Sequence, residues 1–467
     1  MAPAHSSSWM QTHRDAFGSR PLYKLCIPNS HDAGTYRLDY GTSGGGKGPV
    51  LTQTKSILEQ LNIGVRRFDI RPTFANRPGT AEFSWHCGHY TGEAADKIGW
   101  QGGSCASIQE VVNQVNEFTK DNAELIILDI SHTYAINISN PISSTSRDVN
   151  PDEWASLFST LKGINCLFTV DRVGGDHGKP LQDYLLDEFI GNGKAAVIVP
   201  VDEYSNRQEL IRHGFWPVHT LEGKPYLSLG GTSVTHTQNN SEAIWSVLLP
   251  SGADSVLNLA AKEQQERFPW LLQQLASESL SASSITMDRI ENADLLTFCL
   301  AVSYYRYYQE TGRSEQPVVV YGAALITNAN AQEQIQAAIQ QGRSISADNQ
   351  LLTDTWEGIH KSCAVLYSHG GLVKGRWARE GSQLHFGQDV MSVTYGNKEV
   401  MNAKLYYRLL KLIEERGTVR VTNQEIVGGD QNDPLVGTRK TCVVVYRRRG
   451  AAEKEERHAL EFDNMSF

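Results

Sequence analysis

Short strand-like runs alternate with segments of helical periodicity across residues 20–310, and this pattern limits the folds open to the chain. The predicted strands are residues 22–27, 64–70, 125–130 and 195–201, and the last two are almost continuously apolar. Strands of that kind are covered on both faces, which is typical of a parallel sheet flanked by helices. Many strand–helix units in one stretch favour a TIM-type (β/α)8-like barrel over an open sheet. The sequence therefore predicts an α/β fold, with a barrel domain over residues 1–310.

A second domain is predicted beyond the polar segment 309–317, where the chain repeats itself. Tyr321 precedes Asn349 by the same interval that separates Tyr395 from Asn423, and each copy continues with Gly-x-x-Lys-[Ser/Thr]-Cys. Matching spacing at this many positions indicates an internal duplication. We therefore expect a β-rich domain of two related units at 318–449, followed by a loose charged tail at 450–467.

The charge balance excludes one large class of partner. The 43 lysines and arginines are outnumbered by 52 aspartates and glutamates, so the formal net charge is −9. A chain without an excess of cations lacks what a general nucleic-acid binder needs to neutralise phosphates. The start of the chain has no basic segment followed by an apolar one, and no window has the ~20 apolar residues of a membrane span. A cytoplasmic or peripheral membrane location is expected.

The seven cysteines are odd in number, widely scattered, and form no C-x-x-C pair. This usage argues against a zinc ribbon or a thioredoxin-type site and is typical of buried thiols in a reducing compartment. Cys87 and Cys105 flank one loop, and whether they form a bridge stays open.

Three polar segments carry residues suited to catalysis. Residues 29–35 and 67–72 follow or end predicted strands, where barrel enzymes place catalytic groups, and residues 85–90 are expected at the same edge. Two imidazoles can serve as general base and general acid, an arginine can hold a phosphate in a bidentate fork, and aspartates can orient the imidazoles. The residues concerned are His31, Asp32, Asp69, Arg71, His86 and His89. This set suits cleavage of a phosphodiester without a metal ion.

These segments resemble the X-domain of phosphatidylinositol-specific phospholipases C, and more closely its metal-independent bacterial-type branch. The resemblance rests on the blocks at 30–35 (SHDAGT), 64–71 (GVRRFDIR) and 124–132 (ELIILDISH), and it extends over roughly residues 20–310. It implies a (β/α)8-like barrel and a substrate that is a phosphoinositide or a related phosphodiester. Peripheral contact with a membrane is then expected. Basic clusters at Lys374, Arg376 and Arg379, or at 447–449, are candidates for it.

The resemblance also implies roles for individual residues. His31 takes the proton from the inositol 2-hydroxyl, which attacks phosphorus and yields diacylglycerol and inositol 1,2-cyclic phosphate. A second histidine protonates the departing glycerol oxygen and is supported by Asp32. Arg71 clamps the phosphate, Asp69 holds Arg71, and Asp288 orients His31.

Two of these assignments have competitors in the sequence. His86 and His89 both lie in the third segment, and the Gly-His-Tyr pattern favours His89. Asp294 competes with Asp288. Calcium-dependent members carry an acidic residue where this chain has Arg71, so we expect no bound metal and no cofactor.

Three further points stay open at the level of sequence. The same barrel could act on a soluble phosphodiester, or it could be a catalytically silent module that binds lipid or inositol phosphate. The second domain shows no ligand signature. His132, which follows a predicted strand, is expected to be structural.

Overall fold

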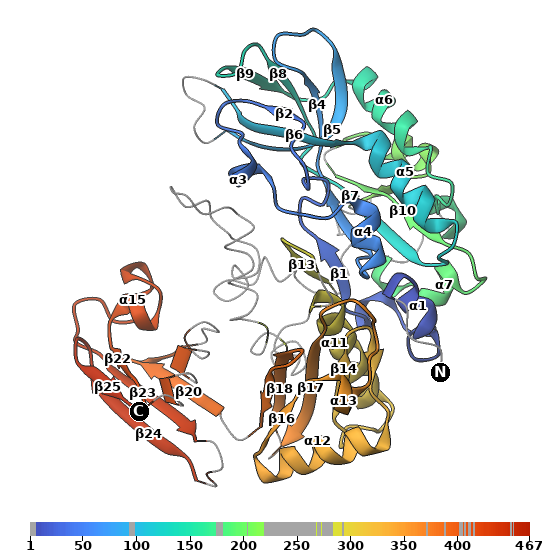
Figure 1. The fold of residues 1–467 in the computed structure, drawn as a ribbon. Helices are drawn as coiled ribbons and strands as arrows, with labels where there is room; N and C mark the ends of the chain where they lie inside the picture. The colour runs from blue at the N-terminus through green and yellow to red at the C-terminus, as the bar shows by residue number, and fades with distance from the viewer. Residues whose placement is uncertain are drawn as a thin grey trace.

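The computed structural model describes residues 6–92, 99–173, 181–202, 204–218, 284–291, 294–369, 372–386, 389–400, 416–448, 451 and 453–467, with single positions between them. Figure 1 shows a parallel sheet with helices, an antiparallel sheet beyond it whose strands alternate with it in the sequence, and two smaller β-rich units towards the C-terminus.

The parallel sheet has the strand order β12-β11-β7-β3-β1-β13, with β10 also paired to β7. Every pair in it is parallel, and β1, β10, β11, β12 and β13 are buried along their whole length. The bounds are β1 (Ile27–Ser30), β3 (Arg67–Ile70), β7 (Leu125–Ile130), β10 (Ala196–Ile198), β11 (Pro200–Val201), β12 (Trp216–Pro217) and β13 (Ser284–Met287). The predicted α/β class is confirmed. Among the described residues, β12 and β13 are the two ends of the sheet. Apart from positions 268 and 272, residues 219–283 fall outside the described part of the chain, so closure of the sheet into a barrel stays a prediction.

The first strand begins later than the sequence predicts. Residues Leu22–Lys24 form a short 3-10 helix, and β1 starts only at Ile27. The apolar residues Leu22, Leu25 and Cys26 are nevertheless fully buried. Their apolar character therefore reflects burial in the core and not an extended backbone.

Helices cover the parallel sheet, and the local sequence explains where they start. The helix α5 (Ile108–Thr119) is capped by Ser107 and buries Ile108, Val111, Val112, Val115 and Phe118. A capping box and a proline at the first turn begin α6 (Pro151–Leu161). The remaining helices of this part are α4 (Ile57–Asn62), α7 (Leu186–Ile190), α8 (Arg207–His213) and α11 (Asp294–Glu310). Figure 1 shows α4, α5 and α6 along one side of the sheet.

A buried ion pair ties the N-terminal segment to the sheet. Arg66 Nε lies 2.9 Å from Glu124 Oε2, and both side chains are fully buried. Glu124 also accepts from the backbone N–H groups of Met10 and Gln11 in and around α1 (Trp9–Thr12). Because each charge is matched inside the core, the pair fixes the start of the chain to the sheet.

A six-stranded sheet of order β2-β6-β5-β4-β8-β9 extends beyond the parallel one. Its pairs are antiparallel except that of β4 with β8, which continues the parallel pair of β3 with β7. Its strands are β2 (Tyr40–Gly41), β4 (Pro72–Asn76), β5 (Phe83–Thr91), β6 (Gln101–Ser107), β8 (Tyr134–Ile138) and β9 (Ser144–Arg147). The third polar segment, 85–90, therefore lies inside β5 and not at the end of a parallel strand, which corrects that expectation. The sheet brings it to the site because β4 directly follows β3.

The C-terminal part contains two four-stranded antiparallel sheets of matching order, β15-β14-β17-β18 and β21-β20-β23-β24. The first unit comprises β14 (Val318–Tyr321), β15 (Ala324–Leu325), α12 (Ala329–Gln341), β16 (Ser344–Ser346), α13 (Asn349–Leu352), β17 (Ser362–His369), β18 (Leu372–Arg379) and β19 (Gln383–His385). The second comprises β20 (Asp389–Tyr395), β21 (Lys398–Glu399), β22 (Thr418–Arg420), α15 (Asn423–Ile426), β23 (Thr441–Arg447), β24 (Glu455–Leu460) and β25 (Asn464–Ser466). The division of the chain into domains stays a prediction.

The residues by which the duplication was detected touch one another in both units. Tyr321 donates to Asn349, and Tyr395 donates to Asn423. Lys361 lies over the Tyr321 ring between Asp354 and Glu380, and its counterpart in the second unit lies over the Tyr395 ring between Asp433 and Glu461. The spaced residues thus form the same polar network twice.

Residues 450–467, predicted to be a loose charged tail, contain β24 and β25, which pair with β23 and β22. In β24 half-buried residues alternate with exposed ones, and Met465 and Phe467 are buried. The segment is therefore an ordered part of the second unit, in which Glu456 is exposed while Glu461 is buried against Lys440, and the expectation of a tail is corrected.

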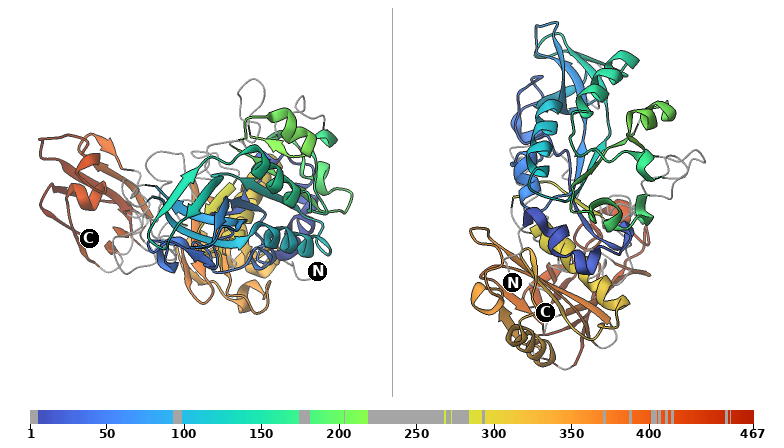
Figure 2. Two further views of the ribbon diagram at one scale, coloured as in Figure 1. Left: turned by 90° about the horizontal axis from the view of Figure 1, so that it is seen from above. Right: turned by 90° about the vertical axis from the view of Figure 1, so that its right-hand side faces the viewer.

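The first unit shares a hydrophobic core with the parallel sheet. Val318, Val320, Ala364 and Leu366 belong to the same buried cluster as the residues of α11. Figures 1 and 2 show α11 between this unit and the strands β1 and β13. The polar segment 309–317 is thus a connection beside a continuous core.

The cluster Lys374, Arg376 and Arg379 is not a free cationic surface. Lys374 is buried, Arg376 donates to the backbone oxygen of His385, and Arg379 pairs with Asp294 at 2.7 Å. In the second candidate cluster, Arg448 pairs with Glu455. Within the described part of the chain, no helix has the length and apolar character needed to cross a bilayer.

Candidate active site

Three neighbouring strands of the parallel sheet bring the predicted site residues together. His31 and Asp32 follow β1, Asp69 and Arg71 lie at the end of β3, and Asp288 follows β13. The order β3-β1-β13 makes these strands adjacent, so their carboxyl ends meet at one edge. Asp32 has a positive φ of 43°, which turns the chain sharply after the strand.

His31 is held at both ring nitrogens. Its Nδ1 lies 2.7 Å from Oδ1 of Asp288, and its Nε2 lies 2.8 Å from Nη2 of Arg71. A carboxylate can only accept and a guanidinium can only donate, so these two contacts correspond to the unprotonated form of the ring, with hydrogen on Nδ1 and a lone pair on Nε2. Gln53 supports the loop by donating to the backbone oxygens of His31 and Met287.

Arg71 lies between two carboxylates. Its Nε is 2.6 Å from Oδ1 of Asp32, and its Nη2 is 2.9 Å from Oδ2 of Asp69. The second oxygen of Asp69 accepts a hydrogen bond from Ser131. The guanidinium is therefore fixed at a defined place beside His31.

The two histidines of β5 have different surroundings, because residues three apart in a strand point to opposite faces of the sheet. His86 is buried, and its ring nitrogens contact the backbone oxygen of Cys105 and the hydroxyl of Ser84. His89 lies with Nδ1 3.1 Å from the backbone oxygen of Val50 and 3.6 Å from Oδ2 of Asp32. The geometry thus places His89, and not His86, beside the other site residues.

The two aspartates that competed in the sequence are also separated. Asp288 contacts His31, whereas Asp294 lies at the start of α11, accepts from Ser362 and pairs with Arg379. Asp294 therefore joins α11 to the first C-terminal unit.

Electrostatics favour charge on several of these groups. Burial by itself would lower the pKa of His31, but the carboxylates of Asp32 and Asp288 raise it to about 9. Burial would raise the pKa of Asp69, but Arg71 and His31 lower it to about 2. Burial works against charge on Arg71 as well, yet Asp32 and Asp69 raise its pKa above the ordinary value.

His31, Asp32 and Asp69 offer ligand atoms within 4.8 Å of one another, a spacing at which a metal ion could be held. Arg71 already contacts both carboxylates. Its positive charge neutralises the two groups that would otherwise attract a cation, so this donor set does not fit a metal site well.

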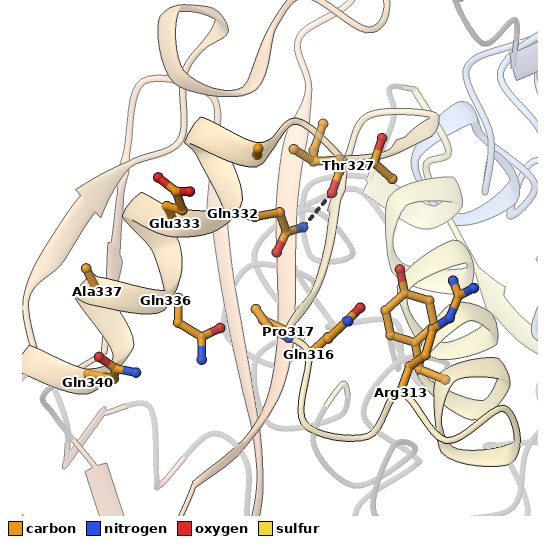
Figure 3. A pocket seen from close by; sticks show the side chains of 12 residues that line it. Arg313, Gln316, Pro317, Thr327, Gln332, Glu333, Gln336, Ala337 and Gln340 are labelled. Carbon is orange, nitrogen blue, oxygen red and sulfur yellow. Dashed lines mark hydrogen bonds between the residues drawn. The ribbon is translucent and has the colours of Figure 1, made fainter.

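A cavity of about 220 Å3 opens beside these residues. Its lining includes Arg71, His89, Trp100, His132 and Tyr134. A larger cavity of about 580 Å3, between the end of α11 and α12, is lined by none of the predicted site residues (Figure 3). The smaller cavity is therefore the candidate substrate site.

Several residues of this site carried no usable signal in the sequence. Gln53, Ser131 and Trp100 are polar or aromatic residues of ordinary type, and only the fold brings them near His31, Asp69 or His89. His132 was visible as a histidine after a strand, but its sequence context suggested a structural role.

The seven cysteines are free thiols. Cys87 and Cys105, for which a bridge was left open, are both buried, as are Cys26, Cys299, Cys363 and Cys442, whereas Cys166 is half-buried.

Some known proteins are similar to part of this chain. No family model matches the chain. PI-PLC X domain-containing protein 3 from Bos taurus and from Mus musculus is 26% identical over 152 residues, and the human protein of that name is 25% identical. The match covers 28% of this chain and 43% of those relatives, so the chain aligns with less than half of their length. These similarities support the resemblance of this chain to the PI-PLC X-domain family.

Two solved structures are also similar. Phosphatidylinositol-specific phospholipase C from Staphylococcus aureus has a TM-score of 0.38 at 14% identity, covering 62% of this chain and 92% of that one. The Listeria monocytogenes enzyme of that name has a TM-score of 0.36 at 17% identity, covering 64% and 98%. Scores of this size indicate a distant similarity, and the fold of this chain is described from its own strand pairing.

Proposed function

We propose that this chain cleaves a phosphodiester, acting on phosphatidylinositol to release diacylglycerol and inositol 1,2-cyclic phosphate. One observation carries the proposal. His31 and His89 face the same buried carboxylate oxygen, Oδ2 of Asp32, at 3.8 and 3.6 Å, with Arg71 bound to the other oxygen. Two imidazoles around one anion, beside a fixed cation, suit acid–base catalysis at a phosphate.

In the proposed first step, His31 is the general base. Its Nε2 takes the proton of the inositol 2-hydroxyl, and the resulting oxygen attacks phosphorus. Asp288 accepts from Nδ1 and stabilises the imidazolium that forms. Arg71 turns its guanidinium from Nε2 to the non-bridging phosphate oxygens, whose negative charge it neutralises.

His89 is the general acid in the same step. Its Nδ1–H is directed at the Val50 oxygen, which leaves Nε2 to carry the proton that goes to the departing glycerol oxygen. Asp32 has a fully buried side chain, and Arg71 contacts its Oδ1, which leaves Oδ2 facing the two histidines. A buried carboxylate oxygen stabilises a protonated imidazole nearby, which supports the assignment of the acid.

The second step returns both histidines to their starting states. Water loses a proton to His89 and attacks the cyclic phosphate, while His31 protonates the 2-oxygen as that bond breaks. The product is inositol 1-phosphate, and no metal ion or cofactor takes part in either step because Arg71 supplies the positive charge.

Phosphorus NMR on vesicles of phosphatidylinositol tests the proposal. A cyclic phosphate signal should appear with the native chain and be absent with His31→Ala. Glycerophosphoinositol in a parallel sample distinguishes a soluble substrate from a lipid one. Absence of turnover with both substrates would overturn the proposal and favour a silent binding module.

A further inference from the structure

His132 lines the cavity together with His89, and the proposed reaction gives it no role. It follows β7 and lines the same cavity as Arg71 and His89. Its φ is +51°, a conformation that residues other than glycine adopt at a cost. Strained backbone that directs a side chain into a cavity is a common feature of functional sites.

Hydrogen bonding determines which nitrogen of this ring carries the proton. The Ser131 hydroxyl donates its single hydrogen to Oδ1 of Asp69, at 3.0 Å. Asp69 has a pKa of about 2, so it is ionised and can only accept. The same Ser131 oxygen lies 3.0 Å from Nδ1 of His132 and must therefore accept from an N–H there. The neutral ring of His132 consequently bears its hydrogen on Nδ1 and a lone pair on Nε2.

In this ring Nδ1 is engaged by Ser131, whereas Nε2 is open to a ligand in the cavity. In His86 both ring nitrogens contact protein groups. In His132 one nitrogen is bound to Ser131, and no contact of Nε2 is seen among the described residues. The ring is exposed at the cavity. A lone pair held in a fixed orientation at a cavity accepts a hydrogen bond from a hydroxyl group.

The wall beside His132 suits a polyol as well. Trp100 and Tyr134 form an aromatic pair with ring centroids 4.8 Å apart, and both line the cavity. Aromatic faces pack against the C–H groups of a polyol while polar groups at the margin bind its hydroxyls.

We infer that His132 is a substrate-positioning residue whose Nε2 accepts a hydrogen bond from a hydroxyl of a polyol bound in this cavity. The inference deepens the proposed function and rests on it for the identity of the bound group, but its tests use structure and binding without turnover. Asp69 thereby serves two residues: one oxygen holds Arg71 for the phosphate, and the other, through Ser131, sets the tautomer of His132 for the hydroxyl.

Nitrogen NMR of the imidazole rings at alkaline pH tests the tautomer directly. We expect His132 in the Nδ1–H form in the native chain and a mixture of forms in Ser131→Ala. An Nε2–H form of His132 in the native chain would overturn the inference.

Binding of myo-inositol and of inorganic phosphate, measured separately by NMR titration, tests the role. His132→Phe should weaken binding of myo-inositol by about fivefold or more, the value of one hydrogen bond, and change phosphate binding less than about twofold. His132→Gln, which keeps an acceptor, should recover most of the affinity. His458→Phe, at an exposed histidine of β24, is the matched control and should leave both affinities unchanged.

Three results would overturn the inference: no saturable binding of myo-inositol to the native chain, unchanged affinity in His132→Phe, or an equal loss of phosphate binding, which would indicate a purely structural role. A native chain that binds myo-inositol through His132 but cleaves no phosphodiester would remove the proposed function and leave this inference standing.

Discussion

Nδ1 of His31 lies 2.7 Å from Oδ1 of Asp288, although the two residues are 257 positions apart in the chain. The contact depends on the parallel pairing of β1 with β13, in which Ser30 is aligned with Met287. One strand pair thus aligns a histidine with the carboxylate that contacts its Nδ1.

Replacing Asp288 by Asn should shift the pH dependence of the proposed reaction. A general base works only when unprotonated, so kcat/KM of the native chain should rise with pH through the His31 pKa near 9. Asp288→Asn removes a negative charge that raises this pKa, so the rising limb should move to lower pH. The maximal rate should fall about 100-fold or more, because the ring loses its orienting acceptor. A limb that stays in place would contradict the assigned pair.

The general acid can be identified from the leaving group. His89→Ala should lower the turnover of phosphatidylinositol by about 100- to 10,000-fold, the usual range for loss of acid–base catalysis. A substrate that releases nitrophenolate needs no proton on its leaving oxygen and should lose far less. His86→Ala is the matched control, for which we expect lower thermal stability and no dependence on the leaving group. A leaving-group effect in His86→Ala instead would reverse the assignment.

Removal of metal ions should leave activity unchanged, because Arg71 occupies the space between Asp32 and Asp69. Turnover is measured in EDTA and again after addition of calcium. Arg71→Lys should lose most activity, since an ammonium group cannot form the paired contacts of a guanidinium. Loss of turnover in EDTA that calcium restores would show that a cation is needed.

His13 should make the folded state sensitive to acid. Its Nε2 lies 3.0 Å from the backbone oxygen of Ala323, and its Nδ1 lies 2.7 Å from the Tyr304 hydroxyl. Burial lowers its pKa to about 4, whereas the unfolded value is about 6.5. The unfolded chain therefore gains a proton first as the pH falls, and about 3 kcal/mol of stability should be lost between pH 6.5 and pH 4.

Urea unfolding at several pH values measures this loss. His13→Gln has no group that titrates in this range, so its free energy of unfolding should fall less steeply with acid. An identical slope for the two chains would contradict the role of His13.

The candidate site was partly visible in the sequence because some of its residues are local. His31 and Asp32 are adjacent, and Asp69 and Arg71 lie at the end of one strand, so short-range pattern was enough to propose them. Their catalytic roles stay predictions. The odd spacing of His86 and His89 places them on opposite faces of a strand, but the sequence does not say which face meets Asp32. That choice depends on how β4, β5 and β6 pair, which a linear pattern does not contain.

In the C-terminal part, too, the sequence predicted local features better than the pairing of strands. The spacing of Tyr321, Asn349 and Lys361 predicted a repeat because the same spacing returns in the second unit. The charged composition of residues 450–467 suggested a loose tail, but alternate side chains are half-buried once β24 pairs with β23. Composition does not reveal which face of a strand its charges occupy.

The α/β class and the local blocks that carry the histidines, aspartates and arginine follow from the sequence alone, because hydrophobic pattern and short motifs are properties of neighbouring residues. The pairing of strands places Asp288 against His31 and Asp294 against Arg379, and it lets Ser131 link Asp69 to His132. These contacts join residues far apart in the chain. They arise from the order in which strands pair, and that order is set by packing of the whole core.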